Sequence, residues 1–293
     1  MLWIPFTVFA ALMQAWRNAL QKQLSQDLGA TSVTLARFVL AGPLAGLYLW
    51  GLYIWQPTEK IPDFSGLFVL YIVGAAISQI VATALMVRLF QLRNYAVGVG
   101  LAKSEAIWAA VLGTLFFGSL LSPLGWLGVG IGGLAVALLS GLRNIQGAIS
   151  PNTLIVGVAS GLTFALTSLW VREASLLLGL SFPFSAAWVL LLVISLQTLL
   201  LVGWLGLRDP PSLMGLVKRP KLTALISLCS CLGSIGWFSA MSLESVALVK
   251  TLGQVEVLFT LLISAYYFKA KLAHQHYVGL GLIVIAAICV MWA

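Results

Sequence analysis

Residues 96–117 read AVGVGLAKSEAIWAAVLGTLFF, and residues 247–268 read ALVKTLGQVEVLFTLLISAYYF. Both are apolar runs of about 20 residues, the length at which an α-helix crosses the hydrocarbon core of a bilayer. Each run contains one glutamate, Glu105 or Glu256, far from either end. An acid in the middle of a membrane span is costly, and two such acids in corresponding runs indicate a repeated unit.

A shift of 151 positions superposes the two runs without a gap and continues beyond them. It also places Trp108 on Phe259, so each copy has an aromatic residue about one helical turn after its glutamate, on the same face. The identities are Ala96 with Ala247, Leu101 with Leu252, Glu105 with Glu256, Phe117 with Phe268, Leu121 with Leu272, Gly128 with Gly279, Gly130 with Gly281 and Ala135 with Ala286. The two glutamates weigh most, because leucine and alanine recur throughout an apolar chain.

The composition of the whole chain requires a bilayer. Of its 293 residues, 61% are hydrophobic and 8% are charged, and the mean hydropathy is +1.04. So few charges cannot cover a water-facing surface, which excludes a cytosolic enzyme. The net charge of +8 does not indicate nucleic-acid binding, because the basic residues are scattered between apolar runs. The three cysteines lie in apolar stretches and predict neither a disulfide framework nor a metal site.

Charges, prolines and polar clusters divide the chain into ten expected spans, five in each half. The fold class predicted is therefore all-α and polytopic, with a first repeat over residues 1–146 and a second over 147–293. Because five is odd, the second copy must lie upside down in the bilayer, the inverted-repeat architecture of many secondary transporters. The spans are expected near 3–20, 33–55, 66–87, 96–117, 123–141, 153–170, 184–206, 222–242, 246–268 and 275–292.

The chain resembles the ten-helix EamA-type branch of the drug/metabolite transporter superfamily. The resemblance covers nearly the whole chain and rests on an Arg that opens the second span and on a pattern shared by spans four–five and nine–ten. The residues are Ala36-Arg37-Phe38-Val39-Leu40-Ala41, Leu115-Phe116-Phe117-Gly118 with Gly128-Val129-Gly130, and Tyr266-Tyr267-Phe268 with Gly279-Leu280-Gly281. The resemblance implies a multi-pass transporter of the bacterial inner membrane, a monomer or weak homodimer. The chain departs from the family pattern at Glu105 and Glu256, where a proline is usual.

Glu105 and Glu256 are the leading candidates for binding a substrate or a proton. If both face one cavity, desolvation and mutual repulsion disfavour two bare carboxylates, which suits a proton carrier or a counter-ion for a cation. The alternative is a set of structural ion pairs, Glu105 with Lys103 or Arg37 and Glu256 with Lys250 or Arg88. On a continuous helix neither lysine stands over its own glutamate, so Lys103 and Lys250 are expected to find partners elsewhere.

A site with both signs of charge would suit a zwitterion such as an amino acid. Arg37, Lys103 and Lys250 are candidate partners for a substrate anion. Trp108 and Trp237 are candidate walls that stack on a ligand or attract a cation, or they pack against lipid. Gln14, Gln79 and Gln254, with other mid-span polar residues, either bond a substrate or join neighbouring helices; those other residues are Asn18, Ser78, Thr83 and Ser234.

No motif for a catalytic nucleophile, a nucleotide loop or a metal-binding helix is visible, so the chain is not expected to be an enzyme or to hold a cofactor. Without a nucleotide site, transport would be driven by protons or exchange. The leading prediction is an exporter of amino acids or related amphipathic metabolites. A flippase for a lipid or lipid-linked sugar would use the same fold but needs a lateral opening between helices.

Overall fold

A computed structural model describes residues 1–57, 60–92, 101–139, 151–266 and 274–293. Over these residues the chain is all-helical, without a strand. The expected boundary between the two repeats, after residue 146, falls within 140–150, which lies outside the described residues. The helices are α1 (Trp3–Leu24), α2 (Ala30–Phe38), α3 (Ala41–Trp55), α4 (Gly66–Leu92), α6 (Glu105–Phe116), α7 (Pro123–Leu139), α8 (Pro151–Leu177), α9 (Phe184–Arg208), α10 (Pro210–Val217), α11 (Pro220–Leu243), α12 (Val246–Leu252), η1 (Gly253–Val255), α13 (Glu256–Tyr266) and α14 (His274–Met291).

Six of the helical segments are long and apolar enough to cross a membrane, and the chain is therefore a multi-pass helical membrane protein. Three shorter apolar helices accompany them. The six are Ala30–Trp55, Gly66–Gln91, Pro151–Leu177, Phe184–Arg208, Pro220–Leu243 and Val246–Ile263, and the shorter ones are Glu105–Phe116, Pro123–Leu138 and Val278–Met291.

Proline and glycine set several helix ends. Pro123, Pro151, Pro210 and Pro220 are the first residues of their helices, where the missing N–H would have no partner in any case. At the end of α6, Gly118 takes a left-handed conformation (φ 63°), and the N–H of the next residue returns to the carbonyl of Gly113, 3.0 Å away. This closing turn needs a residue without Cβ.

The second expected span is broken rather than continuous. Its two parts, α2 and α3, meet at Leu40, the residue before the first turn of α3. Pro43 has no N–H to donate to the carbonyl of Val39, four residues earlier, and its ring crowds that turn. The break leaves Arg37 near the end of α2. Beyond α9, the segment expected to be a loop contains the short helix α10.

The ninth expected span is also broken, into α12, η1 and α13, and the glutamate is the first residue of α13. The fourth span behaves alike: a turn at Lys103 and Ser104 precedes α6, which begins at Glu105. Both glutamates were expected about ten residues into continuous helices. Instead, a turn comes directly before Glu105, and the 3-10 segment η1 comes directly before Glu256.

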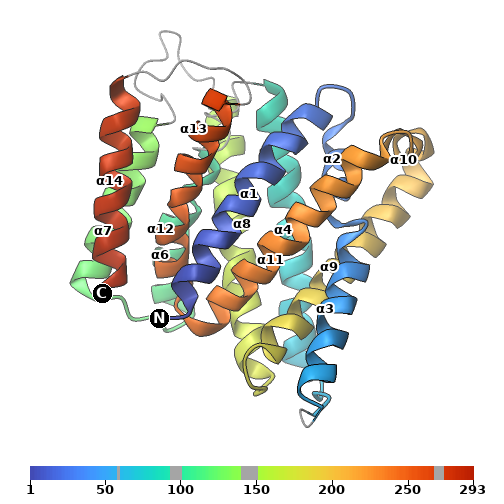
Figure 1. Ribbon diagram of the computed structural model, residues 1–293, viewed down its shortest axis with the longest axis horizontal. Helices are drawn as coiled ribbons and strands as arrows, with labels where there is room; N and C mark the ends of the chain where they lie inside the picture. The colour runs from blue at the N-terminus through green and yellow to red at the C-terminus, as the bar shows by residue number, and fades with distance from the viewer. Residues whose placement is uncertain (58–59, 93–100, 140–150, 267–273) are drawn as a thin grey trace.

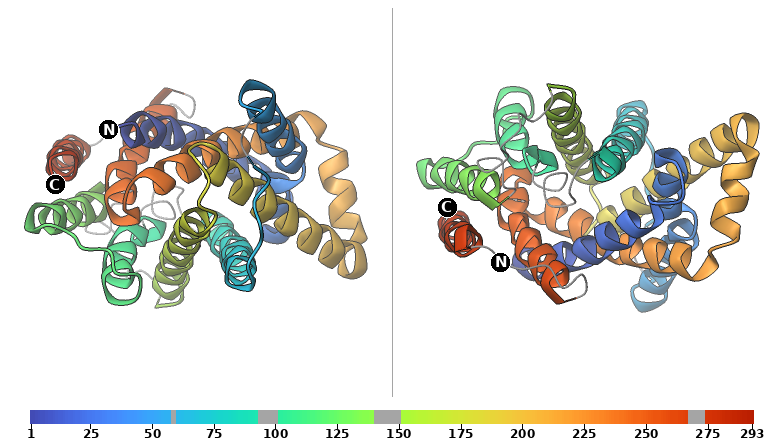
Figure 2. Two further views of the ribbon diagram at one scale, coloured as in Figure 1. Left: turned by 90° about the horizontal axis from the view of Figure 1, so that it is seen from below. Right: turned by 90° about the horizontal axis from the view of Figure 1, so that it is seen from above.

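Close helix pairs hold the bundle together through small residues. Along α1 and α11, which run antiparallel, a Cβ added at Gly236 would lie 2.8 Å from the carbonyl oxygen of Phe6. Between α4 and α8, the ring of Trp170 lies directly against Gly74, and α7 packs on α14 at Gly128. Figures 1 and 2 show α7 and α14 side by side at one end of the molecule and α10 at the other, with both termini at one edge. Such small residues let membrane helices approach closely.

Candidate functional site

A small polar cavity lies inside the bundle, where the broken helices of both halves meet. It is lined by residues of α1, α2, α4, α6, α8, α11, α12 and α13, and its free volume is about 30 Å³. That space holds roughly one or two water molecules. The cavity contains two acids and three bases, all of them buried: Glu105, Glu256, Arg37, Lys103 and Lys250.

Glu256 is fully buried and bound on both carboxylate oxygens. Asn18 donates its side-chain amide to one oxygen at 2.7 Å, while Gln14 and Lys103 donate to the other, each at 2.5 Å. Both amides come from α1, and Lys103 precedes α6. The carboxylate of the second half is therefore tied to two elements of the first half.

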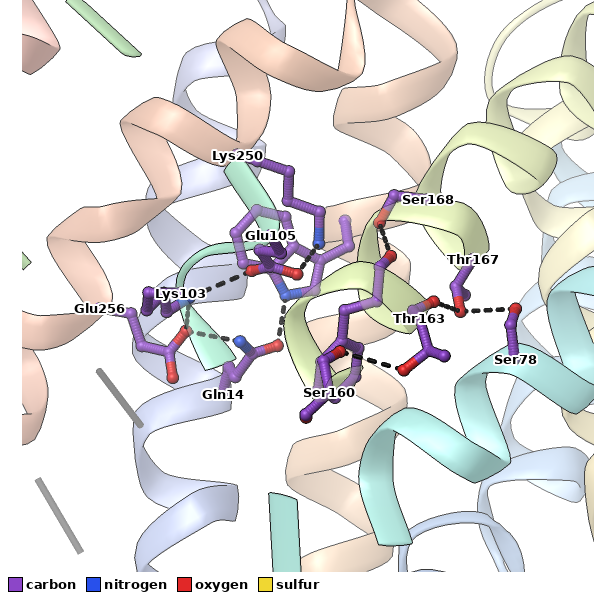
Figure 3. Close-up of polar contacts among 12 residues, drawn as sticks. Gln14, Ser78, Lys103, Glu105, Ser160, Thr163, Thr167, Ser168, Lys250 and Glu256 are labelled. Atoms are coloured by element: carbon purple, nitrogen blue, oxygen red, sulfur yellow. Dashed lines mark hydrogen bonds and ion pairs between the residues drawn. The ribbon is translucent and has the colours of Figure 1, made fainter. Parts of the chain in front are cut away.

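Glu105 has looser partners. The ammonium groups of Lys103 and Lys250 each lie 3.4 Å from one of its two oxygens. Figure 3 shows the two lysines approaching Glu105 from different sides, with Lys103 between the two glutamates. Lys103 thus contacts the glutamate of each half, and Lys250 of the second half contacts the glutamate of the first half.

These contacts form a crossed arrangement, in which the lysine of each half pairs with the glutamate of the other. Two opposite charges at such distances attract by about 5–7 kcal/mol at the effective dielectric of a protein interior, before the cost of removing them from water. The four paired charges sum to zero, which lowers the cost of their burial, and Arg37 adds one further buried positive charge at the cavity.

Trp237 of α11 forms one wall of the cavity. Its indole N–H donates to the side-chain oxygen of Gln14 at 2.9 Å, and Gln14 in turn donates to Glu256. The ammonium of Lys250 lies 4.4 Å from the ring centroid, within range of a cation–π contact. A Cβ at Gly253 would come within 2.4 Å of the ring, so the helix break and the position of the ring depend on each other.

Arg37 is the third base at the cavity. Its guanidinium donates to the hydroxyls of Thr83 at 2.7 Å and Ser230 at 3.2 Å. Among the described residues, no carboxylate lies within 4 Å of it. The alternative pair Glu105–Arg37 is therefore not formed.

The structure brings together at this cavity most of the residues that the sequence analysis singled out. The singled-out residues that line it are Gln14, Asn18, Arg37, Gln79, Lys103, Glu105, Ser234, Trp237, Lys250 and Glu256. Gln79 accepts from the amide of Gln197 at 2.6 Å. Trp108 is half-buried and packs against the apolar core, and Gln254 is buried against Gly132 of α7, so neither lines the cavity.

The ion pairs combine parts of both readings of the sequence. The pair Glu105–Lys103 was an expected alternative, and it forms because the chain turns at Lys103 and Ser104 instead of continuing as a helix. The alternatives for Glu256 do not form: Lys250 contacts Glu105 instead, and Arg88 is exposed on α4. A position-by-position comparison could not reveal the crossing, because it depends on which helices face each other.

Sequence reasoning missed the contribution of α8. Phe164, Thr167 and Ser168 line the cavity, and Thr167 bonds Ser78 of α4 at 2.8 Å. With Ser160, which donates to a carbonyl of α4, these residues recur at helical spacing on one side of α8. That polar stripe in an apolar span was the available signal.

No protein-family model and no curated protein matches this chain. Solved structures do share its fold. One crystal structure of a protein superposes with a TM-score of 0.69 at 14% sequence identity, over 98% of this chain and 96% of the other. At this identity the likeness shows the fold alone, and the fold extends over both whole chains.

Proposed function

We propose that the protein is a secondary transporter of a small organic metabolite, which crosses the membrane by alternating access. The leading substrates are amino acids or related amphipathic metabolites, exported by coupling to protons or by exchange. The observation that carries the proposal is the buried set of crossed ion pairs, Lys103–Glu256 and Lys250–Glu105, at the junction of the broken helices. Broken helices and charges of both signs at mid-depth are typical of transporter binding sites.

The proposal includes ten crossings arranged as two inverted five-helix halves, as in the EamA-type drug/metabolite transporters. The packing supports this arrangement. Exchange of the halves turns the contact of α4 with α8 into the contact of α11 with α1, and both contacts exist. It likewise turns α6 on α8 into α13 on α1, while α7 on α14 maps onto itself. A pseudo-twofold axis between the halves requires these matched pairs.

The cavity also supports a coupling between binding and movement. A free volume of about 30 Å³ is too small for an amino acid, so a substrate enters only when the ion pairs separate. A ligand with charges of both signs can replace the pairs that it breaks. Its binding then favours a conformation with the two halves apart, which is the population shift that alternating access needs.

The test uses purified protein in two stages. A thermal-shift screen of amino acids and related metabolites selects a ligand, and proteoliposomes loaded with that ligand are then assayed for exchange. We expect Glu105→Gln and Glu256→Gln to lose exchange, whereas Asp63→Asn, which neutralises an exposed carboxylate, retains it. Wild-type exchange rates in both glutamine variants, or absence of exchange of every stabilising ligand, would refute the proposal.

The lipid flippase needs a lateral opening into the cavity. A large groove between α2, α4 and α9 is mostly apolar and has a volume of about 560 Å³. It shares no lining residue with the ion-lined cavity. This separation favours a metabolite that enters from water over a lipid that enters from the side.

A further inference from the structure

We infer that Glu105 and the face of Trp237 form an ammonium-binding subsite, which the side chain of Lys250 occupies in this structure and which the amino group of a substrate takes over. The subsite follows from geometry alone. Its use by a transported substrate rests on the proposed function.

The surroundings of the Lys250 ammonium are those of a bound organic cation. A carboxylate oxygen of Glu105 lies 3.4 Å from it on one side, and the centroid of the Trp237 ring lies 4.4 Å away on the other. A carboxylate combined with an aromatic face is the chemistry that recognises ammonium ligands. Among the described residues, no other acid lies within 4 Å of this ammonium group.

The two glutamates differ in how firmly they are held. Glu256 accepts three hydrogen bonds at 2.5–2.7 Å, two of them from amides. Glu105 contacts only the two lysines, each at 3.4 Å, and no amide donor reaches it in the part of the chain that the structure describes. A carboxylate can accept about four hydrogen bonds, so Glu105 has capacity for a new donor and Glu256 has little. Glu256 therefore keeps its hydrogen-bond partners, whereas Glu105 can exchange a lysine for another ammonium group.

Trp237 offers a rigid face. Gln14 holds its indole N–H, Glu256 holds Gln14, and the ring lies against Gly253 at the helix break. The ring therefore keeps its position when Lys250 leaves, so a second ammonium group meets the same surface. Lys250 belongs to α12, which ends at that break, on the other side of η1 from Glu256.

Charge balance then selects the ligand. If a simple amine replaced Lys250, the lysine ammonium would remain buried without an anion, which is strongly unfavourable. A zwitterion avoids this cost because its carboxylate pairs with the displaced Lys250. The wild-type site therefore prefers compounds with an ammonium group and a carboxylate. Removal of the lysine charge should open the same subsite to simple alkylammonium ions.

The experiment is a chemical rescue that needs no transport. Purified wild type, Lys250→Ala and Lys218→Ala, which alters an exposed lysine, are titrated with ethylammonium chloride, with NaCl as the reference salt, and thermal unfolding is recorded. We expect saturable stabilisation by ethylammonium in Lys250→Ala only. The double variant Lys250→Ala/Glu105→Gln should lose it. Lys250→Ala/Trp237→Leu should bind ethylammonium about 2- to 30-fold more weakly, the range that a cation–π contact supplies.

A lack of saturable response in Lys250→Ala would overturn the inference, as would an equal response in wild type or in the Glu105→Gln double variant. Lys250→Ser serves as a second variant, and recovery of folded protein only in ethylammonium-containing buffer counts as rescue. If rescue succeeds but proteoliposomes show no exchange, the proposed transport fails and the subsite stands. If exchange succeeds without rescue, the subsite fails and the proposed transport stands.

Discussion

Replacement of Lys103 by Met tests the central ion pair. The ammonium of Lys103 lies 2.5 Å from an oxygen of Glu256, and both side chains are almost completely buried. At an effective dielectric of 20 this pair attracts by about 7 kcal/mol, part of which offsets the desolvation of both charges. Removal of one partner leaves the other charge buried and uncompensated, which costs about 3–5 kcal/mol. The amides of Gln14 and Asn18 remain on Glu256 and limit the loss to that range.

The assay measures the free energy of unfolding in mixed micelles by titration with a denaturing detergent. We expect Lys103→Met to lose about 3–5 kcal/mol, and Lys103→Met/Glu256→Gln to lose less than that single variant, because the double variant removes both charges of the pair and leaves neither partner unpaired. The matched control is Arg219→Met, which breaks the exposed pair with Asp27 and should cost under about 1 kcal/mol. Equal losses in Lys103→Met and Arg219→Met, or additive losses in the double variant, would refute the reasoning.

Four further predictions use the same unfolding assay or a simple reporter. Gly236→Ala should cost about 1–3 kcal/mol of unfolding free energy, because the new Cβ would lie 2.8 Å from a backbone oxygen of α1. The control Gly51→Ala, whose Cβ meets nothing within 4 Å, should be neutral or slightly stabilising. Equal effects of the two substitutions would contradict the close approach of α1 and α11. Gly253→Ala should destabilise the protein, because its Cβ would collide with the Trp237 ring. In the background of Trp237→Leu the same substitution should cost less stability. A double-variant cycle without coupling would show that the ring is not the cause. Arg172 donates to the carbonyls of Met241 and Glu244, near the end of α11. Arg172→Gln should therefore cost about 1.5–3 kcal/mol of unfolding free energy and speed amide hydrogen exchange at that helix end. Unchanged exchange there would show that this contact does not hold the helix end. With the proposed ten crossings, connections on the side of the termini hold two basic residues, Lys60 and Arg172. Those on the opposite side hold ten: Lys22, Arg88, Arg93, Arg143, Arg208, Lys218, Arg219, Lys221, Lys269 and Lys271. Because basic connections stay in the cytosol, a reporter that is active only in the periplasm, fused to Ala293, should give a strong signal, and a silent reporter with normal expression would reverse the orientation.

Several features of the fold could be predicted from the sequence because they depend on local chemistry. Apolar runs about 20 residues long predict membrane helices wherever they occur, and Pro123, Pro151 and Pro220 mark helix starts by the N–H that they lack. Six of the segments meet the length and composition of a membrane span. The breaks near Leu40 and Gly253 were missed, because an interrupted span has the same composition as a continuous one.

For the candidate site, too, the sequence predicted individual residues but not the contacts between them. The sequence indicated Glu105, Glu256, Lys103 and Lys250 by a simple rule, that an ionisable residue in lipid is rare and expensive. It did not indicate the partners. Spacing along one helix argued against a contact between Lys103 and Glu105, and only the turn before α6 makes that contact possible.

What the sequence determined by itself was the environment of the chain, its helical class and the few charges that a membrane would not tolerate without a partner, because hydropathy and charge are properties of each residue. What only the tertiary structure decided was the pairing of each lysine with the glutamate of the other half, the looser hold on Glu105, and the ring of Trp237 beside Lys250. These depend on which helix faces which, and the physical reason is that side chains far apart in the chain attract one another only after packing has excluded water and brought them within a few ångströms.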